Sequence, residues 1–392
     1  MVETIPRRKD FRLLPVFVLL IAVNLSATIL PSAGMEAAAP PGISLSAVGD
    51  LIMHMPVVNS AFSPEDQNFD FRSIFAPLKS TLSAADITVG VLETVLTTRY
   101  DQLSGYPRFY TPYQLAEALR WAGFDLIFTA HNHSLDQGVN GIISTLDHLE
   151  TAGLPTTGTR KSLKQKPYYI MEIAGIKLAF LSYTTITNGL SAPPDKRWML
   201  NTIDFAEIGG QIRELKAAGV DGIIMALHYG DEYVRYPTSA DQQLCYRLCA
   251  LGVDVILGSH PHVIRPLEKV VITDPFTKYP KTCLIAYSLG NFLSNQRWRY
   301  SDCGLMLTLH LRKKIWPPGL EIELLSCSPL WVNRDHRGYQ ILKVPPPEQA
   351  RTVATSPFPT PVQVKFREVW ADTEENLTTW PGGLKQMEYP FF

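Results

Sequence analysis

Between residues 43 and 311 the chain alternates short, β-rich apolar runs with amphipathic helical patterns. This alternation predicts an α/β sheet, because a parallel strand is reached through a crossover helix. Two of the helical patterns carry one apolar stripe each, at Phe205, Ile208, Ile212 and Leu215 and at Leu244, Leu248 and Leu251. We expect each stripe to pack on a face of the sheet.

Six of the apolar runs end in polar or metal-capable residues. These endings are Asp50, Glu93, Ala130-His131-Asn132-His133, His228, Ser259-His260-Pro261-His262 and Asn291. In open α/β sheets, ligands bind at the carboxyl ends of the strands. A single histidine at a strand end is more often structural, but five histidines, an asparagine and two carboxylates at one expected edge favour a shared site.

The residue types at this edge also indicate a class of ligand. Oxygen and imidazole donors without thiolate are the set expected for Mn²⁺, Fe or Zn²⁺. Two neighbouring metals held in this way are the usual machinery of phosphoester cleavage. The sequence therefore predicts a site for one or two divalent metal ions.

The cysteines do not predict a disulfide scaffold or a thiolate zinc site. They are odd in number, with no C-x-x-C pair, and stand at Cys245, Cys249, Cys283, Cys303 and Cys327. Cys245 and Cys249 lie four residues apart in a helical pattern, so we expect both to be small apolar core residues.

Charge and composition exclude other classes of protein. The 36 Lys and Arg residues against 37 Asp and Glu residues give a net charge of −1, and no basic cluster lies in the interior, so nucleic-acid binding is not expected. With 46% hydrophobic residues, the chain of 392 residues can bury a substantial core. A fibre or a disordered tail is excluded.

The N-terminus predicts passage into or across a membrane. Basic residues between Arg7 and Arg12 precede a mostly apolar run, Leu13–Leu30, which indicates an export signal or a single membrane anchor at 1–40. Small residues at Ser32–Gly34 and at Ala37–Ala39 offer cleavage points, and the sequence leaves cleavage open. Positive charge before the run places the rest of the chain outside the cytoplasm, secreted or anchored at the cell envelope.

The C-terminal part is rich in proline. Residues 345–361 are expected to form an extended surface segment, because so many prolines exclude a helix or a central strand. The tail beyond contains Trp370 and Trp380, and the sequence leaves open whether it packs on the domain. We therefore divide the remaining chain into a domain at 41–335 and a Pro-rich extension at 336–392.

Ordered motifs between about 43 and 310 resemble a known family. They are Gly49-Asp50, Leu92-Glu93-Thr94, Gly105-Tyr106-Pro107-Arg108-Phe109, Asn132-His133-Ser134-Leu135-Asp136-Gln137-Gly138, His228-Tyr229-Gly230-Asp231-Glu232-Tyr233, Gly258-Ser259-His260-Pro261-His262 and Tyr287-Ser288-Leu289-Gly290-Asn291-Phe292. In this order they resemble the CapA family, which is associated with poly-γ-glutamate capsule synthesis. The resemblance implies a calcineurin-like metallophosphoesterase fold, a four-layer α/β/β/α sandwich of two mixed sheets flanked by helices.

The resemblance also implies roles for individual residues. The implied metal ligands are Asp50, Glu93 as the candidate bridge, Asn132, His228, His260 and His262. It further implies that His133 donates a proton or hydrogen bond to the leaving oxygen, and that Asp136 either orients His133 or begins a helix. Arg108 either binds an anionic substrate or forms a surface salt bridge, and Asn291 either holds a turn or contacts substrate.

Three positions depart from the pattern of the resemblance. Phosphoesterases of this fold usually carry a histidine where this chain has Ile52, and His54 is near but out of register. Val91 and His131 replace asparagines that are common in the family. These departures leave open whether one or two metal ions bind.

Three functions follow as hypotheses. The first is a cell-envelope protein that makes, attaches or exports an anionic polymer such as poly-γ-glutamate, with membrane-bound capsule synthesis partners and a metal-dependent hydrolase centre. The second is a secreted metal-dependent phosphoesterase without a capsule role. The third is a non-catalytic module that binds the polymer. All three stay open, because one fold and one set of metal ligands can serve many functions.

Overall fold

A computed structural model describes residues 42–347 and 358–383. The predicted export signal or anchor at 1–40 and most of the proline-rich segment lie outside the described residues. Within the described ranges, no helix has both the length and the apolar character needed to cross a bilayer.

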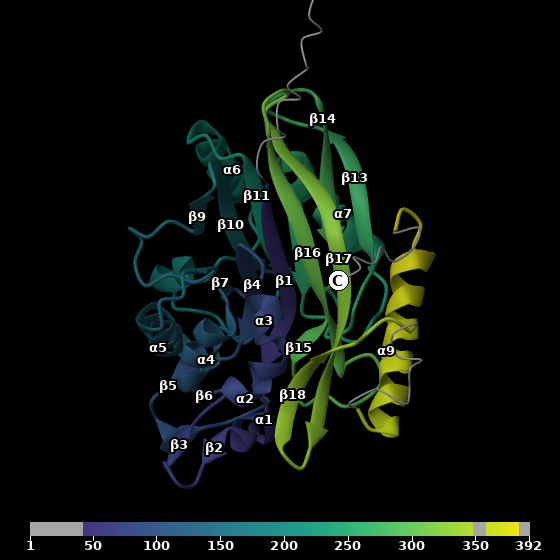
Figure 1. Cartoon of the computed structure of the whole chain (residues 1–392). Helices are drawn as coiled ribbons and strands as arrows, with labels where there is room; N and C mark the ends of the chain where they lie inside the picture. The colour runs from purple at the N-terminus through teal and green to yellow at the C-terminus, as the bar shows by residue number, and fades with distance from the viewer. Residues whose placement is uncertain (1–41, 348–357, 384–392) are drawn as a thin grey trace, which may run out of the picture. The chain divides into compact units, whose positions relative to one another are not determined.

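Two large sheets dominate the fold (Figure 1). The strands of the larger sheet are β1 (Ile43–Ile52), β4 (Ile87–Glu93), β7 (Leu126–Phe128), β8 (Thr156–Thr157), β15 (Asn291–Leu293), β16 (Cys303–Lys314), β17 (Gly319–Asp335) and β18 (Gly338–Lys343). Those of the smaller sheet are β9 (Tyr168–Ile173), β10 (Ile176–Thr184), β11 (Gly222–His228), β12 (Val255–Ser259), β13 (Leu267–Thr273) and β14 (Pro280–Ala286). Their orders are β18-β17-β16-β1-β4-β7-β8, with β15 beside β1, and β13-β14-β12-β11-β10-β9.

Helices and two short strand pairs, β2 with β3 and β5 with β6, lie between these strands. The helices are α1 (Met55–Ser60), α2 (Arg72–Phe75), α3 (Lys79–Leu82), α4 (Gln114–Ala122), α5 (Gly138–Thr151), α6 (Phe205–Ala217), α7 (Ser239–Leu251) and α9 (Thr360–Thr379). The short strands are β2 (Phe62–Ser63), β3 (Asn68–Phe69), β5 (Leu96–Thr97) and β6 (Thr111–Pro112). The two helices predicted from apolar stripes are confirmed as α6 and α7.

The two sheets stack on each other through a shared apolar core. It contains Leu45 and Val89 from the larger sheet and Ile224 and Leu257 from the smaller one, all buried. The opposite faces pack on helices, with α1 to α4 over the larger sheet and α6 and α7 over the smaller one. Strands buried on both faces read as continuous apolar runs, as the sequence shows. The α/β sheet predicted from the sequence pattern and the four-layer α/β/β/α sandwich implied by the resemblance are both confirmed.

One predicted strand is divided between the two sheets. The apolar run that precedes Asn291, at 284–290, predicts a single strand. In the structure β14 stops at Ala286, and β15 begins at Asn291 in the other sheet. Between them the chain turns at Gly290, whose φ of 66° favours glycine. The Gly290 carbonyl accepts a hydrogen bond of 3.0 Å from the Asp50 amide, which ties the crossing segment to β1.

The C-terminal part packs on the domain. Strand β18, which lies in the predicted extension, pairs with β17, and α9 buries Phe366, Val369 and Trp370 against the core. Helix α9 begins at Thr360, so the end of the segment expected to be extended is helical. Proline at the second position permits this start, since the first helical amides lack partners within the helix. The domain limits themselves stay a prediction.

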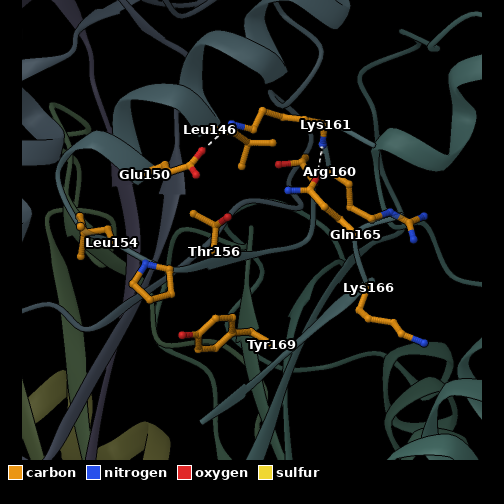
Figure 2. Close-up of a pocket in the computed structure, with 12 residues that line it drawn as sticks. Leu146, Glu150, Leu154, Thr156, Arg160, Lys161, Gln165, Lys166 and Tyr169 are labelled. Atoms are coloured by element: carbon orange, nitrogen blue, oxygen red, sulfur yellow. Dashed lines mark hydrogen bonds and ion pairs between the residues drawn. The ribbon is translucent and has the colours of Figure 1, made fainter. Parts of the chain in front are cut away.

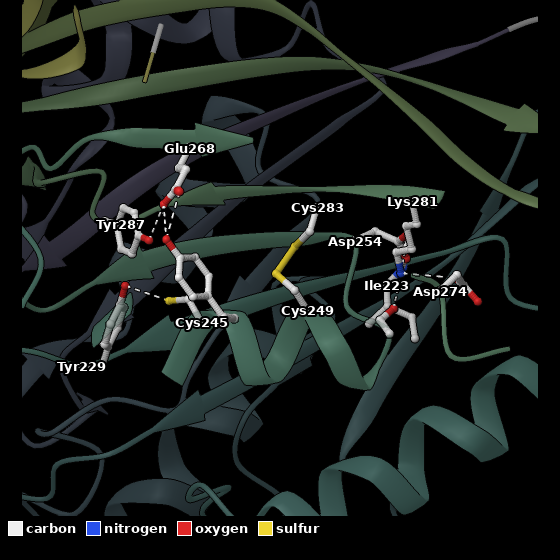
Figure 3. Close-up of a disulfide and its surroundings, with 12 residues drawn as sticks. Ile223, Tyr229, Cys245, Cys249, Asp254, Glu268, Asp274, Lys281, Cys283 and Tyr287 are labelled. Carbon is white, nitrogen blue, oxygen red and sulfur yellow. Dashed lines mark hydrogen bonds and ion pairs between the residues drawn. A yellow bond between two sulfur atoms is a disulfide. The ribbon is translucent and has the colours of Figure 1, made fainter. Parts of the chain in front are cut away.

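A disulfide corrects one expectation about the cysteines. Cys249 of α7 is bonded to Cys283 of β14, and Cys245 lies one turn away with its sulfur 3.2 Å from the Tyr229 hydroxyl (Figure 3). Cys249 is therefore not a free core residue, because packing of α7 on β14 brings the two Cα atoms to 6.1 Å, within disulfide range. Cys245 is a free, buried cysteine, as expected.

The crossing segment gives a stability test. An added Cβ at Gly258 would lie 2.2 Å from the Tyr287 carbonyl oxygen, whereas one at Gly210 of α6 has its nearest neighbour at 3.9 Å. We expect Gly258→Ala to lower the free energy of unfolding by about 1–3 kcal/mol through overpacking. Gly210→Ala should raise it by up to about 1 kcal/mol. Urea unfolding measures both, and equal stabilities of the two variants would contradict the packing described.

Candidate metal centre

The carboxyl ends of strands from both sheets meet at one place. Strands β1 and β4 run parallel with Ile52 opposite Glu93, and β11 and β12 run parallel with His228 opposite Ser259. The backbone amide of His260, just after β12, donates to Asp50 Oδ2 at 3.0 Å and so joins the two sheets. Residues more than two hundred positions apart therefore lie in direct contact.

Two groups of side chains at this edge are close enough to hold a cation. In one group, single ligand atoms of Asp50, Glu93 and His228 all lie within 4.8 Å of one another, and in the other those of Glu93, His260 and His262 do. Glu93 belongs to both groups. Its Oε1 atom is 3.9 Å from Nε2 of His228 and 3.9 Å from Nε2 of His262. The resemblance implied that Glu93 is a bridging ligand, and this role stays a prediction.

Asn132 lies beside the first group. It follows β7 in the loop that leads to α5, and its Oδ1 atom is 3.0 Å from Nε2 of His228. Its amide nitrogen donates to Oδ1 of Asn188 at 3.3 Å. The side-chain oxygen of Asn132 therefore faces the ligand edge, and all six residues expected as ligands lie together.

Neighbouring side chains orient two of the imidazoles. Ser259 Oγ is 2.8 Å from Nδ1 of His228, and Asn291 Oδ1 is 3.1 Å from Nδ1 of His262. These contacts at Nδ1 turn the Nε2 atom of each ring toward Glu93, and Nε2 of His228 also contacts Asn132. Such hydrogen bonds at the second ring nitrogen are usual for histidines that bind metals. The loop after β12 is also constrained, since His260 and His262 both have positive φ, 91° and 57°.

Several polar atoms of this edge are buried without a hydrogen-bond partner. Asp50 Oδ1, Glu93 Oε2 and His260 Nδ1 have no hydrogen-bond partner among the described residues, although all three are buried. Burial first, and then the Asp50 carboxylate, raise the pKa of Glu93 well above 4.5. Burial lowers the pKa of His228 well below 6.5 and that of His260 to about 3. Neutral imidazoles and unpaired carboxylates in one buried cluster fit a divalent cation.

His133 forms a pair with Asp136 next to the cluster. Its Nδ1 atom is 2.8 Å from Asp136 Oδ2, and this oxygen also accepts from the Phe109 amide at 2.7 Å. Asp136 lies before Gln137, the N-cap of α5, so the geometry favours the orienting role over a helix start. The ring of His133 packs against Phe109, with 4.6 Å between ring centroids.

The two residues expected to meet substrate lie in different environments. Arg108 is exposed and joins no ion pair with any described residue. Asn291 is fully buried, and its amide nitrogen donates to the Gln296 side chain at 2.8 Å and the Ser301 carbonyl at 2.7 Å. Together with its contact to His262, these bonds favour the turn-holding role of Asn291.

Four residues at the site were assigned no role from the sequence. His54 lies close to the cluster, where burial, then His262 and His133, lower its pKa to about 4. His131 is buried with its ring centroid 6.1 Å from that of His228. Asn188, which contacts Asn132, comes from a loop whose sequence gives no indication of the site. Ser259 could have been found, because it directly precedes the His260-Pro261-His262 run.

An aromatic rim borders the cluster, formed by Tyr233 and Trp298. Their exposed fractions are 40% and 51%, their ring centroids lie 5.1 Å apart, and Tyr233 lies 5.9 Å from the His262 ring. Buried Arg265 holds the loop that carries Tyr233, by donating to the carbonyls of Asp231 and Val234 at 3.0 and 2.7 Å. The rim offers flat apolar surface beside the ligand edge.

A pocket of about 430 Å³ lies apart from these residues (Figure 2). Its cations are already engaged, because Lys161 pairs with Asp147 and Glu150, at 2.7 and 2.5 Å, and Arg160 donates to the Trp198 carbonyl. None of the expected site residues lines it. We assign no function to this pocket.

Comparison with known proteins gives a family match. The profile described as "Bacterial capsule synthesis protein PGA_cap" matches residues 44–296. The chain is 29% identical over 276 residues to the PGA biosynthesis protein CapA of Bacillus subtilis (strain 168), covering 69% of this chain and 68% of that protein. It is 26% identical over 203 residues to the capsule biosynthesis protein CapA of Bacillus anthracis, covering 51% of this chain and 47% of that relative.

Solved structures give more distant likenesses. The NAD nucleotidase NadN of Haemophilus influenzae matches with a TM-score of 0.47 and 14% identity, covering 87% of this chain and 61% of that one. The calcineurin-like phosphoesterase YfkN of Bacillus subtilis matches with a TM-score of 0.40 and 12% identity, covering 85% and 98%.

Metal content tests the shared position of Glu93. We expect Glu93→Gln to lower the divalent metal bound per purified full-length chain at least about tenfold, because it removes a charge common to both groups. Glu172→Gln, at an exposed position of β9, should keep the wild-type content. Elemental analysis after reconstitution with Mn²⁺ or Zn²⁺ measures both. Wild-type metal content in Glu93→Gln would contradict the assignment.

The buried histidines predict a pH dependence of the metal-free chain. His54, His131, His228 and His260 have lowered pKa values, so below about pH 6.5 the unfolded state binds more protons than the folded state. The free energy of unfolding should therefore fall as the pH drops from about 6.5 to about 5, by up to about 1.4 kcal/mol per pH unit per histidine. The raised pKa of Glu93 opposes this trend, but as one group against four.

Urea unfolding in the presence of a chelator measures this slope. His131→Asn should make it shallower, whereas His336→Asn, at an exposed turn, should not. A stability that stays level between about pH 6.5 and pH 5 would show that these imidazoles are not buried as described.

Proposed function

The chain belongs to the family of bacterial capsule synthesis proteins, PGA_cap, and on this premise we propose that it makes, attaches or exports an anionic envelope polymer such as poly-γ-glutamate. The names of the two Bacillus relatives, which refer to PGA and capsule biosynthesis, support this role. The observation that carries the proposal is a family match that spans every residue of the candidate metal centre. A metal-dependent hydrolase centre is part of it.

The proposal places the domain outside the cytoplasm. The basic residues before the apolar run Leu13–Leu30 support export or anchoring at the cell envelope. The Cys249–Cys283 disulfide also supports this location, since disulfides persist in oxidising compartments. Membrane-bound capsule synthesis proteins are the proposed partners.

The proposed chemistry rests on the ligand cluster and on His133. Asp50, Glu93, Asn132, His228, His260 and His262 are the proposed metal ligands. A divalent cation held there would supply Lewis-acid polarisation of a substrate oxygen. The Glu93 carboxylate belongs to both groups of ligands, so it would link them and fix the distance between them.

His133 is the proposed general acid. Its Nδ1 proton is held by the Asp136 carboxylate at 2.8 Å, so Nε2 is the atom left to give a proton to a leaving oxygen. Asn188 lies 3.4 Å from this Nε2 atom and restrains the ring from the other side. Arg108 is the proposed contact for an anionic substrate. It is exposed and forms no ion pair with the described residues. It also directly precedes Phe109, whose ring packs on His133.

A second candidate is a secreted metal-dependent phosphoesterase without a capsule role. The His133–Asp136 pair beside the ligand cluster favours it, because phosphoester cleavage needs a proton donor at the leaving oxygen. Turnover of an aryl phosphate ester with Mn²⁺, together with normal capsule in a deletion strain, would select this candidate. The third hypothesis, a polymer-binding module, requires polymer binding that survives His133→Ala.

Capsule content tests the proposal. In a deletion strain of the source organism, His133→Ala should restore at least about tenfold less surface polymer than the wild-type gene, because proton donation contributes factors of about 10² or more. His336→Ala, at the exposed turn between β17 and β18, should restore it fully. Immunoblots must show equal amounts of each variant. Full restoration by both His133→Ala and Glu93→Gln would contradict a catalytic role in capsule formation.

A further inference from the structure

Two hairpin ends, one between β13 and β14 and one between β16 and β17, lie together at one end of the two sheets (Figure 1). The turn between β13 and β14 carries Phe276 and Tyr279, and the turn between β16 and β17 carries Ile315 and Trp316. The Tyr279 and Trp316 rings touch edge to face, with 5.5 Å between their centroids. The two turns therefore form one continuous surface, which we call the tip patch and define as Phe276, Tyr279, Ile315 and Trp316.

The four side chains of the tip patch are large, apolar and exposed. Ile315 is 83% exposed and Trp316 73%, while Tyr279 and Phe276 are 43% and 39% exposed. Aromatic and aliphatic side chains gathered at an exposed tip mark a site of contact with a partner or a membrane. Tryptophan and tyrosine in particular are enriched where protein meets the bilayer interface, since they have an apolar body and a polar tip.

The charge around the tip patch is positive. Lys278 and Lys314 flank it, and neither forms an ion pair with any described residue. The carboxylate of this turn, Asp274, is buried, with one oxygen 3.9 Å from the Lys281 ammonium. The Lys278 ammonium also donates to the Pro275 carbonyl at 2.7 Å. Lysines outside ion pairs beside interfacial aromatic residues fit a surface of anionic lipid headgroups.

The chain enters the domain at this same end. Strand β1 starts at Ile43, which pairs with Leu311 of β16. Ile315 follows four residues after Leu311, just past the end of β16. The apolar run that predicts an export signal or anchor ends at Leu30, so a fully extended connection to Gly42 spans at most about 40 Å. The described chain therefore begins at the end of the domain that carries the tip patch.

We propose that the tip patch docks onto the interface of a bilayer that contains anionic lipids, with Trp316 and Ile315 inserted at headgroup level. Asp50 lies seven residues beyond Ile43 on β1, and Ile315 lies four residues beyond Leu311, the partner of Ile43. At about 3.3 Å per strand residue, docking therefore holds the metal centre roughly 36 Å from the lipid surface. The candidate site then faces away from the membrane, toward polymer in the envelope. This inference goes beyond the proposed function and stands without it, since none of the proposed metal ligands takes part in the docking.

Quenching of tryptophan fluorescence tests the docking. The full-length chain would be placed in nanodiscs of phosphatidylethanolamine and phosphatidylglycerol, with and without bromine on the acyl chains. We expect the quenching seen in the wild type to fall roughly twofold or more in Trp316→Phe, because Trp316 is the inserted ring. Trp298→Phe is the matched control, since Trp298 is 51% exposed but borders the metal centre, and it should leave the quenching unchanged.

A second pair of variants tests the charge. Lys278→Glu combined with Lys314→Glu should also reduce the quenching, and Lys164→Glu, at an exposed loop remote from the tip, should not. Quenching that is equal in the wild type and Trp316→Phe would overturn the proposal. If a crosslinker at position 316 captured a membrane protein in cells while lipid bromines left Trp316 unquenched, the tip patch would belong to a protein partner instead.

Discussion

Two buried carboxylates without partners are the constraint on which the rest of the site depends. Asp50 and Glu93 are 0% and 1% exposed, and each keeps an oxygen without a hydrogen bond among the described residues. Burial of such charges costs several kcal/mol unless a counter-charge compensates them. Histidines with lowered pKa values cannot serve as that counter-charge, because they stay neutral. A bound cation would explain both the unpartnered carboxylates and the neutral histidines, because metal ligands are ionised carboxylates and neutral imidazoles.

The stacking of two sheets makes this arrangement possible. One sheet supplies Asp50 and Glu93, and the other supplies the histidines, so neither sheet holds the full set of ligands alone. The crossing segment at 287–290 links the sheets, and the amide of His260 reaches across to Asp50. Close approach of backbone at Gly258 and Gly290 is what lets the two strand ends meet. The geometry of the site is therefore a property of the interface between sheets.

Much of this could be predicted from the sequence, because the parallel strands carry continuous apolar runs that end in polar residues. The positions of Asp50, Glu93 and His228 follow from that pattern and from the common edge of parallel strands. The Cys249–Cys283 bond and the contact of Asn188 with Asn132 could not, because both depend on how separate elements pack. The long hairpin of β16 and β17 was also not predicted, because the sequence pattern up to residue 311 indicated alternating strands and helices.

The molecule separates its two proposed contacts along the strands. The ligand cluster lies at the carboxyl end of β1 and the tip patch beyond its amino end, so chemistry and anchoring do not compete for the same surface. The central claim, a cation held in common by both sheets, is tested most directly by crystals of the full-length chain grown with Zn²⁺ and measured at the zinc absorption edge. The account predicts an anomalous peak within about 2.2 Å of the Glu93 carboxylate, with His228 or His262 as a further ligand. A map without a peak among these residues, or one that shows Asp50 and Glu93 far apart, would contradict it.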